Sequence, residues 1–92
     1  MYYIVTFDIP DDTTRRRVGD LLETYGLRVQ RSVFEISCNA KQRRRLIDDI
    51  KALIDIHTDS VRFYPIDTKR AKEAFELGRF PDPFEREAVY FF

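Results

Sequence analysis

The sequence predicts one domain of the α+β class, with strands and helices in the order β-α-β-β-α-β. A chain of 92 residues has the length of one compact domain. Four short segments are rich in β-branched and aromatic residues, as strands are. Two longer segments repeat apolar residues at the spacing of a helix. This order is typical of the ferredoxin-like fold, in which both helices lie on one face of an antiparallel sheet.

The chain opens with a predicted strand, residues 2–9, that carries apolar side chains on both faces. Such a strand is expected at the centre of a sheet that is covered on both sides. The turn at Pro10 is followed by helix N-cap candidates at residues 11–14. Gly26 is expected to end the helix as the residue after its C-cap. The apolar stripe of this helix consists of Val18, Leu21, Leu22 and Tyr25.

Residues 27–38 are expected to form either two short strands or one bent strand. The alternation of apolar side chains loses its phase at Arg31 and Ser32, which marks the expected bend or bulge. The second helix is expected to open at residues 39–40. Its apolar stripe consists of Leu46, Ile47, Ile50, Leu53 and Ile54.

The last part of the predicted domain is a polar loop, residues 55–59, followed by a strand over residues 60–66. Pro65, near the end of this strand, indicates an edge position or the exit from the sheet. The domain is therefore expected to cover residues 1–66, and residues 67–92 to form a C-terminal appendage.

The appendage is expected to contain a helix over residues 69–77, ended by Gly78, and an extended linker over residues 79–83. Residues 88–92 are expected to form a short aromatic strand that would aggregate if it were left in water. We expect this strand to add to a sheet edge of a second copy of the chain, where it would lock a dimer.

A homodimer is also expected from the sheet face that the two helices leave open. Depending on register, this face carries Tyr2 and Ile4, or Tyr3, Val5 and Phe7. Either set is too large an apolar patch for a soluble monomer. Packing of sheet against sheet in a symmetric dimer would cover it.

The formal net charge is zero, but the two halves of the chain differ. Residues 1–45 carry nine basic and six acidic side chains, and residues 46–92 carry seven basic and ten acidic ones. Eight of the nine basic residues in the first half are arginines, whose planar guanidinium suits phosphate oxygens. Two Arg triplets, residues 15–17 and 43–45, therefore suggest a phosphate-bearing partner. The alternative is that these triplets lie on solvated helix faces.

The composition excludes several classes of site. A single cysteine, Cys38, rules out an internal disulfide framework and a zinc-finger ligand set, and is expected in the core. The three glycines form no phosphate-binding loop, and Ser32 lacks the context of a nucleophilic serine. The only histidine, His57, is expected at the surface. No apolar stretch approaches the roughly 20 residues that span a bilayer, and the N-terminus does not resemble a signal peptide, so a cytoplasmic location is expected.

Two side chains allow both a functional and a structural interpretation. Asp8, at the end of the first strand, is either a turn-forming residue or a Mg²⁺ ligand. Because Mg²⁺ can be held by one or two carboxylates and several waters, two copies of Asp8 in a dimer could share one ion. Phe34 could stack on a base, as exposed strand aromatics do, or lie in the core, as Phe more often does.

The chain resembles the small CRISPR-associated adaptation proteins of the Cas2 family over residues 1–66. The similarity begins with Phe7-Asp8-Ile9 and continues through the basic start of the first helix, residues 14–18. It is strongest over residues 25–35, and residues 59–65 also match.

The resemblance implies a homodimer of ferredoxin-like protomers that binds single-stranded RNA or double-stranded DNA and partners an integrase in capturing new spacers. It further implies a Mg²⁺-dependent endonuclease in which Asp8 is the catalytic, metal-binding acid. The nucleic-acid-binding residues that it implies are Arg15, Arg17, Arg28 and Phe34, to which we add Arg31 for its charge and proximity. A non-catalytic adaptor for double-stranded DNA is the alternative function.

Overall fold

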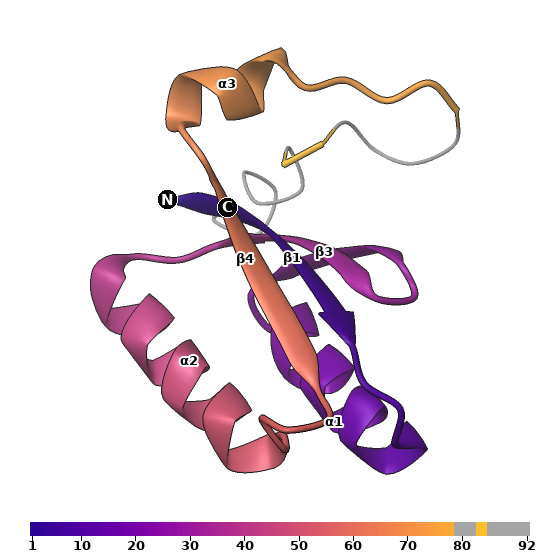
Figure 1. Ribbon diagram of the computed structural model, residues 1–92. Coiled ribbons are helices and arrows are strands. Elements are labelled where there is room, and N and C mark those ends of the chain that lie inside the picture. The colour runs from indigo at the N-terminus through magenta and orange to yellow at the C-terminus, as the bar shows by residue number, and fades with distance from the viewer. Residues whose placement is uncertain (79–82, 85–92) are drawn as a thin grey trace.

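The computed structural model describes residues 1–78 and 83–84, and Figure 1 shows a four-stranded sheet with two helices packed against one face. The strands are β1 (Tyr2–Asp8), β2 (Gly26–Gln30), β3 (Val33–Ser37) and β4 (Ser60–Ile66). The helices are α1 (Asp12–Glu23), α2 (Ala40–Leu53) and α3 (Thr68–Glu73). The sheet order is β2-β3-β1-β4, and all neighbours are antiparallel. The predicted α+β, ferredoxin-like fold is confirmed.

The hydrophobic core lies between the sheet and the helices α1 and α2. Tyr3, Val5 and Phe7 of β1 are at most 6% exposed, whereas Tyr2 and Ile4 lie on the opposite face and are only partly buried. β1 is therefore central, as predicted, but α1 and α2 cover only one of its two apolar faces. We call the other face the open sheet face.

Helix α1 begins as predicted and ends differently. Asp11 is the N-cap, because its carboxylate accepts hydrogen bonds from the Thr14 amide and hydroxyl groups. The C-cap is Thr24, and Gly26 is already the first residue of β2, so the prediction that Gly26 ends the helix is wrong. A Cβ atom at Gly26 would lie 2.0 Å from the Glu35 carbonyl oxygen. Glycine is thus needed for the close approach of β2 to β3.

The expected break in residues 27–38 is confirmed as a two-residue turn at Arg31 and Ser32 that separates β2 from β3. A further irregularity lies inside β2, where the pairing with β3 shifts between Arg28 and Gln30. After β3, Asn39 caps α2 in a reciprocal capping box with Gln42, as the sequence indicated for the helix start.

β4 pairs with β1 and is an edge strand among the described residues, as Pro65 predicted. α3 is shorter than the predicted helix over residues 69–77, because Ala74 already has extended backbone angles. Gly78, with a positive φ of 136°, lies beyond the end of α3 and does not terminate it. The predicted strand at residues 88–92 and most of the predicted linker lie outside the described residues. None of the described helices is long and apolar enough to cross a membrane.

Candidate nucleic-acid interface

Asp8 lies at the C-terminal end of β1, on the open sheet face and exposed to solvent. It shares this face with Tyr2, Ile4 and Thr6, because alternate residues of a strand point to opposite faces. Its carboxylate forms no hydrogen bond or ion pair with any residue that the structure describes. Within the described chain, Asp8 forms no hydrogen bond that would give it the alternative turn-forming role, and the helix that follows is capped by Asp11. Asp8 is therefore free to bind a ligand.

Arg15 is close to Asp8 in the sequence, but its side chain is held by the loop between β1 and α1. Its Nη1 atom donates to the carbonyl oxygens of Ile9, at 2.9 Å, and Pro10, at 3.4 Å, and its Nη2 atom pairs with Asp12. These bonds order the connection between β1 and α1. In this conformation Arg15 fixes the loop behind Asp8 and does not extend toward a phosphate.

Arg28 is also held internally, at the junction of α1 with the β2–β3 turn. Its guanidinium lies 4.7 Å from the centre of the Phe34 ring. Its Nε atom donates to the Glu23 carboxylate at 2.9 Å, and its Nη1 atom donates to the Arg31 carbonyl oxygen at 2.7 Å. Gly19 leaves room for this arrangement, because a Cβ there would lie 2.4 Å from Arg28 Nη2.

Phe34 lies in the core. Its side chain is 0% exposed and stacks on Phe7 with the ring centres 6.0 Å apart. A ring that is enclosed by the core and by Arg28 offers no face to a base. The core alternative is therefore confirmed, and this buried position does not favour the predicted contact of Phe34 with nucleic acid, which stays a prediction. Phe34 can act on a ligand only through the position of Arg28.

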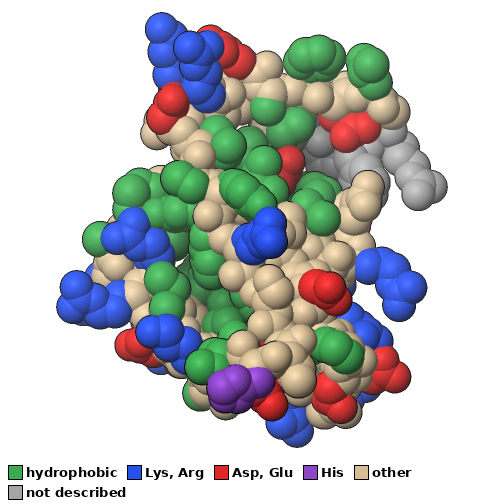
Figure 2. All heavy atoms as spheres, in the orientation of Figure 1, with side chains coloured by type: hydrophobic (Ala, Val, Ile, Leu, Met, Phe, Trp, Pro, Cys, Tyr) green, Lys and Arg blue, Asp and Glu red, His purple; other side chains and the backbone are tan. Residues whose placement is uncertain are grey.

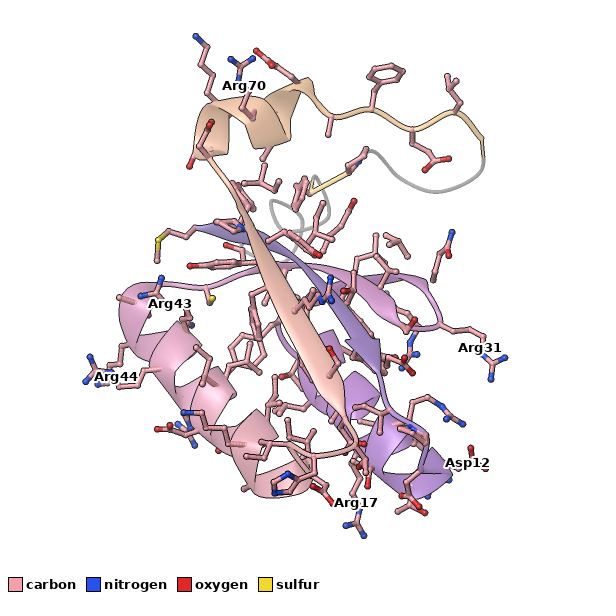
Figure 3. The ribbon with its side chains drawn as sticks, in the orientation of Figure 1. Asp12, Arg17, Arg31, Arg43, Arg44 and Arg70 are labelled. Carbon is pink, nitrogen blue, oxygen red and sulfur yellow. The ribbon has the colours of Figure 1, made fainter. Side chains whose placement is uncertain are left out.

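Arg17 and Arg31 differ from Arg15 and Arg28, because both are exposed and point away from the fold in Figure 3. Neither side chain forms a hydrogen bond or ion pair within the described part of the chain. Arg17 extends from α1 and Arg31 from the β2–β3 turn, so the structure does not bring the two guanidinium groups together. Of the four arginines predicted to bind nucleic acid, Arg17 and Arg31 have side chains that are available for phosphate. Arg15 and Arg28 instead hold the neighbouring loops in place.

Comparison with known proteins places this arrangement in a family. The family model for CRISPR associated protein Cas2 matches residues 1–74. The chain belongs to the Cas2 family. It is 40% identical over 89 residues to a CRISPR-associated endonuclease Cas2 of Thermus thermophilus, a match that covers 92% of this chain and 90% of that relative. It is 32% identical over 90 residues to a CRISPR-associated endoribonuclease Cas2 of Pyrobaculum aerophilum, with 97% of each chain covered.

Solved Cas2 structures have the same fold. The crystal structure of Streptococcus pyogenes Cas2 matches with a TM-score of 0.75 and 32% identity, covering 85% of this chain and 100% of that one. A chain of a partial Cas6-RT-Cas1–Cas2 complex matches with a TM-score of 0.65 and 30% identity, covering 91% of this chain and 97% of that one. The resemblance noted from the sequence is thus confirmed at the level of family and fold.

The fit of Asp8 to a metal ion can be tested on this Cas2 structure. No group of three or more His, Cys, Asp or Glu side chains among the described residues could hold a metal ion. One chain therefore supplies Asp8 as a free carboxylate at this strand end. Because Mg²⁺ keeps several waters and takes as few as one or two carboxylates, Asp8 has the chemistry of one such ligand.

Sequence reasoning missed a cation on the open sheet face. Arg62 of β4 lies opposite Thr6, two residues along β1 from Asp8. Its Nη1 atom donates to the Tyr64 hydroxyl oxygen at 3.3 Å, and this hydrogen bond raises the pKa of Arg62. The alternation in residues 60–66 carried the signal, because Arg62 and Tyr64 fall on the opposite face from Phe63, which packs against the core.

Phe84 covers the open sheet face at Tyr2, the end of β1 opposite to Asp8. Its ring contacts that of Tyr2 edge-on with centres 5.2 Å apart, and its amide donates to Glu35 Oε1 at 3.1 Å. Burial raises the pKa of Glu35, the nearby Glu76 charge raises it further, and the Phe84 amide lowers it. Figure 2 shows hydrophobic side chains across the middle of the molecule, between α3 and α2.

Proposed function

We propose that this Cas2 family member works as a homodimer that binds nucleic acid in CRISPR adaptation and partners an integrase. One observation carries the proposal: a free, exposed carboxylate, Asp8, lies on the open sheet face at the end of the central strand. Membership of the Cas2 family supports the adaptation role. The likeness to a chain of a complex named for Cas1 and Cas2 supports an integrase partner.

The homodimer follows from the apolar character of the open sheet face. Ile4 and Tyr2 are only partly buried, and Tyr64 is 46% exposed. Two copies that pack these faces together about a twofold axis would bury this surface, as sheets do in sandwiches. The same packing would bring the two strand ends into one interface, so that both Asp8 carboxylates could face a shared Mg²⁺ ion.

We further propose phosphodiester hydrolysis at this place, with single-stranded RNA or double-stranded DNA as substrate. When bound, Mg²⁺ would polarise a phosphate oxygen and activate a water molecule. The two Asp8 carboxylates would hold the ion, and Arg17 and Arg31 would bind flanking phosphates. Arg15 and Arg28 would keep the two supporting loops in position, and Arg62 would add positive charge near the strand ends.

The test is Asp8→Asn, with Asp20→Asn on the exposed side of α1 as the matched control. We expect Asp8→Asn to reduce Mg²⁺-dependent cleavage about 100-fold or more, because a catalytic metal supplies several kcal/mol of transition-state stabilisation. Cleavage of RNA and of duplex DNA is measured with Mg²⁺ and with chelator, and light scattering checks that both variants remain dimeric. Undiminished cleavage by a folded Asp8→Asn dimer would reject Asp8 as the metal-binding acid, and no cleavage by the wild type would reject the proposed hydrolysis.

One observation favours a non-catalytic adaptor as the second candidate: the described residues contain no complete carboxylate cluster. The dimer would then bind duplex DNA through arginine–phosphate contacts, with a steep dependence on salt. Under this function Asp8→Asn leaves spacer capture intact. Loss of capture in the folded variant would count against the adaptor.

A further inference from the structure

The larger local excess of positive charge lies at the start of α2, not at the start of α1. Residues 8–20 contain three arginines, but also Asp8, Asp11, Asp12 and Asp20, which leaves a net charge of −1. Residues 36–48, the same window around the α2 triplet, contain four cations and one acidic residue, Asp48, which leaves a net charge of +3. The Arg triplet in α1 is therefore neutralised locally, whereas the triplet in α2 is balanced only in part, by Asp48.

One member of the α2 triplet has a structural role. Arg43 is half-buried and donates to the hydroxyl oxygen of Tyr3 at 2.6 Å. Lys41, Arg44 and Arg45 are exposed, and we call these three residues the α2 basic surface. None of their side chains forms a hydrogen bond or ion pair with another described residue.

The three cations lie on one side of α2, because residues three and four apart are neighbours on a helix. Arg45 lines a pocket that Glu23 also lines, while Arg44 points away from the sheet in Figure 3. Arg44 and Arg31 extend from opposite sides of the molecule in that view. The α2 basic surface is thus separate from the arginines already considered.

We propose that the α2 basic surface binds the phosphate backbone of duplex DNA, in addition to the contacts proposed for Arg17 and Arg31. The inference rests on the proposed nucleic-acid-binding function and extends it to a new surface. Arginine guanidinium groups match phosphate oxygens, and the positive end of the helix dipole adds to the attraction. α2 contains no aromatic residue on which single-stranded bases could stack, which favours duplex backbone over a single strand.

The test is the double variant Lys41→Ala with Arg44→Ala. The matched control is Lys69→Ala with Lys72→Ala on α3, which removes the same charge from two exposed residues. Residues 67–76 around the control carry three cations and three acids, so no phosphate contact is expected there. Alanine is the best helix former, and circular dichroism checks that both variants fold.

Affinity for a fluorescent 30-base-pair duplex is measured from about 50 to 200 mM salt. Over this range the affinity of binding through phosphate contacts falls steeply. We expect the slope of log K against log salt to fall in magnitude by about 2 in the α2 variant, since each phosphate contact contributes about 0.9. The slope of the control should equal that of the wild type. The duplex affinity of the α2 variant should fall more than its affinity for a single strand of equal length.

The salt slopes distinguish failure of this inference from failure of the proposed function. Equal slopes for the wild type and the α2 variant would overturn the inference and leave the proposed function standing. An equal change in the control would attribute the effect to net charge and also overturn it. An equal loss on single strands would refute the duplex assignment. If the wild type binds no duplex at all, the inference and the proposed DNA binding both fall.

Discussion

Substitution of Phe34 separates a core role from a direct role in binding nucleic acid. The side chain is fully buried, stacks on Phe7 and supports the Arg28 guanidinium. Phe34→Leu keeps an apolar group of similar size in the core, so the fold should persist. It removes the aromatic ring, which is the only part that could stack on a base or attract the cation.

The expected cost of Phe34→Leu can be estimated from these contacts. A hydrophobic swap of similar volume costs less than about 1.5 kcal/mol, and the lost cation–π contact costs about 0.5–1 kcal/mol. The sum, about 2 kcal/mol, is smaller than the stability of about 5–14 kcal/mol expected for a chain of this length. Phe34→Ala, which leaves a cavity, should cost about 3–5 kcal/mol. The free energy of unfolding should therefore decrease from the wild type to Phe34→Leu and further to Phe34→Ala, as the burial of the side chain predicts.

The assay is urea unfolding at one fixed protein concentration, because dimerisation makes stability depend on concentration. It is paired with titration of a fluorescent single-stranded oligonucleotide under native conditions. A buried ring predicts a loss of stability with affinity changed about twofold or less. Base stacking is worth about 1–3 kcal/mol, so a direct role predicts a loss of affinity of about 5- to 150-fold. Unchanged stability with a tenfold loss of affinity would refute the placement of Phe34.

Three further substitutions test the β2–β3 pair and its contact with α1. Gly26→Ala should destabilise the fold by about 1–3 kcal/mol in urea unfolding, because its Cβ would overlap the backbone of Glu35 and Ile36. Gly19→Ala should cost less, since the overlap is with the movable end of Arg28, and equal costs would contradict this. Glu35→Gln should raise the urea midpoint at pH 7. Burial raises the folded-state pKa of Glu35, so wild-type stability falls as pH rises through that pKa. The difference should vanish below pH 4.5, the ordinary pKa, and a constant difference would show that ionisation of Glu35 is not its cause.

Most of the fold could be predicted because its signals are local. The caps at Asp11 and Asn39 depend on residues three positions away, and the burial of Tyr3 and Val5 follows from alternation along one strand. Gly26 was misassigned because its role depends on how closely β3 approaches, which no local pattern encodes.

The candidate site was predicted only in part, because some of its features depend on contacts between distant residues. The position of Asp8 follows from the end of its own strand, so the sequence was sufficient. The fate of each arginine depends on partners that only the folded chain supplies, such as Phe34 beneath Arg28 or Tyr3 beside Arg43. Counting arginines therefore indicated a phosphate-binding protein without distinguishing the engaged guanidinium groups from the free ones.

The bond between Arg28 and the Arg31 carbonyl oxygen bears on the entropy of ligand binding. A hairpin tip that moves freely must lose backbone freedom when a ligand immobilises it, at a cost of about 1–2 kcal/mol per residue. Here the tip is already tethered to a guanidinium that rests on the buried Phe34 ring. Arg31 consequently meets its ligand on a preorganised backbone, and less of the interaction free energy is consumed in ordering the turn.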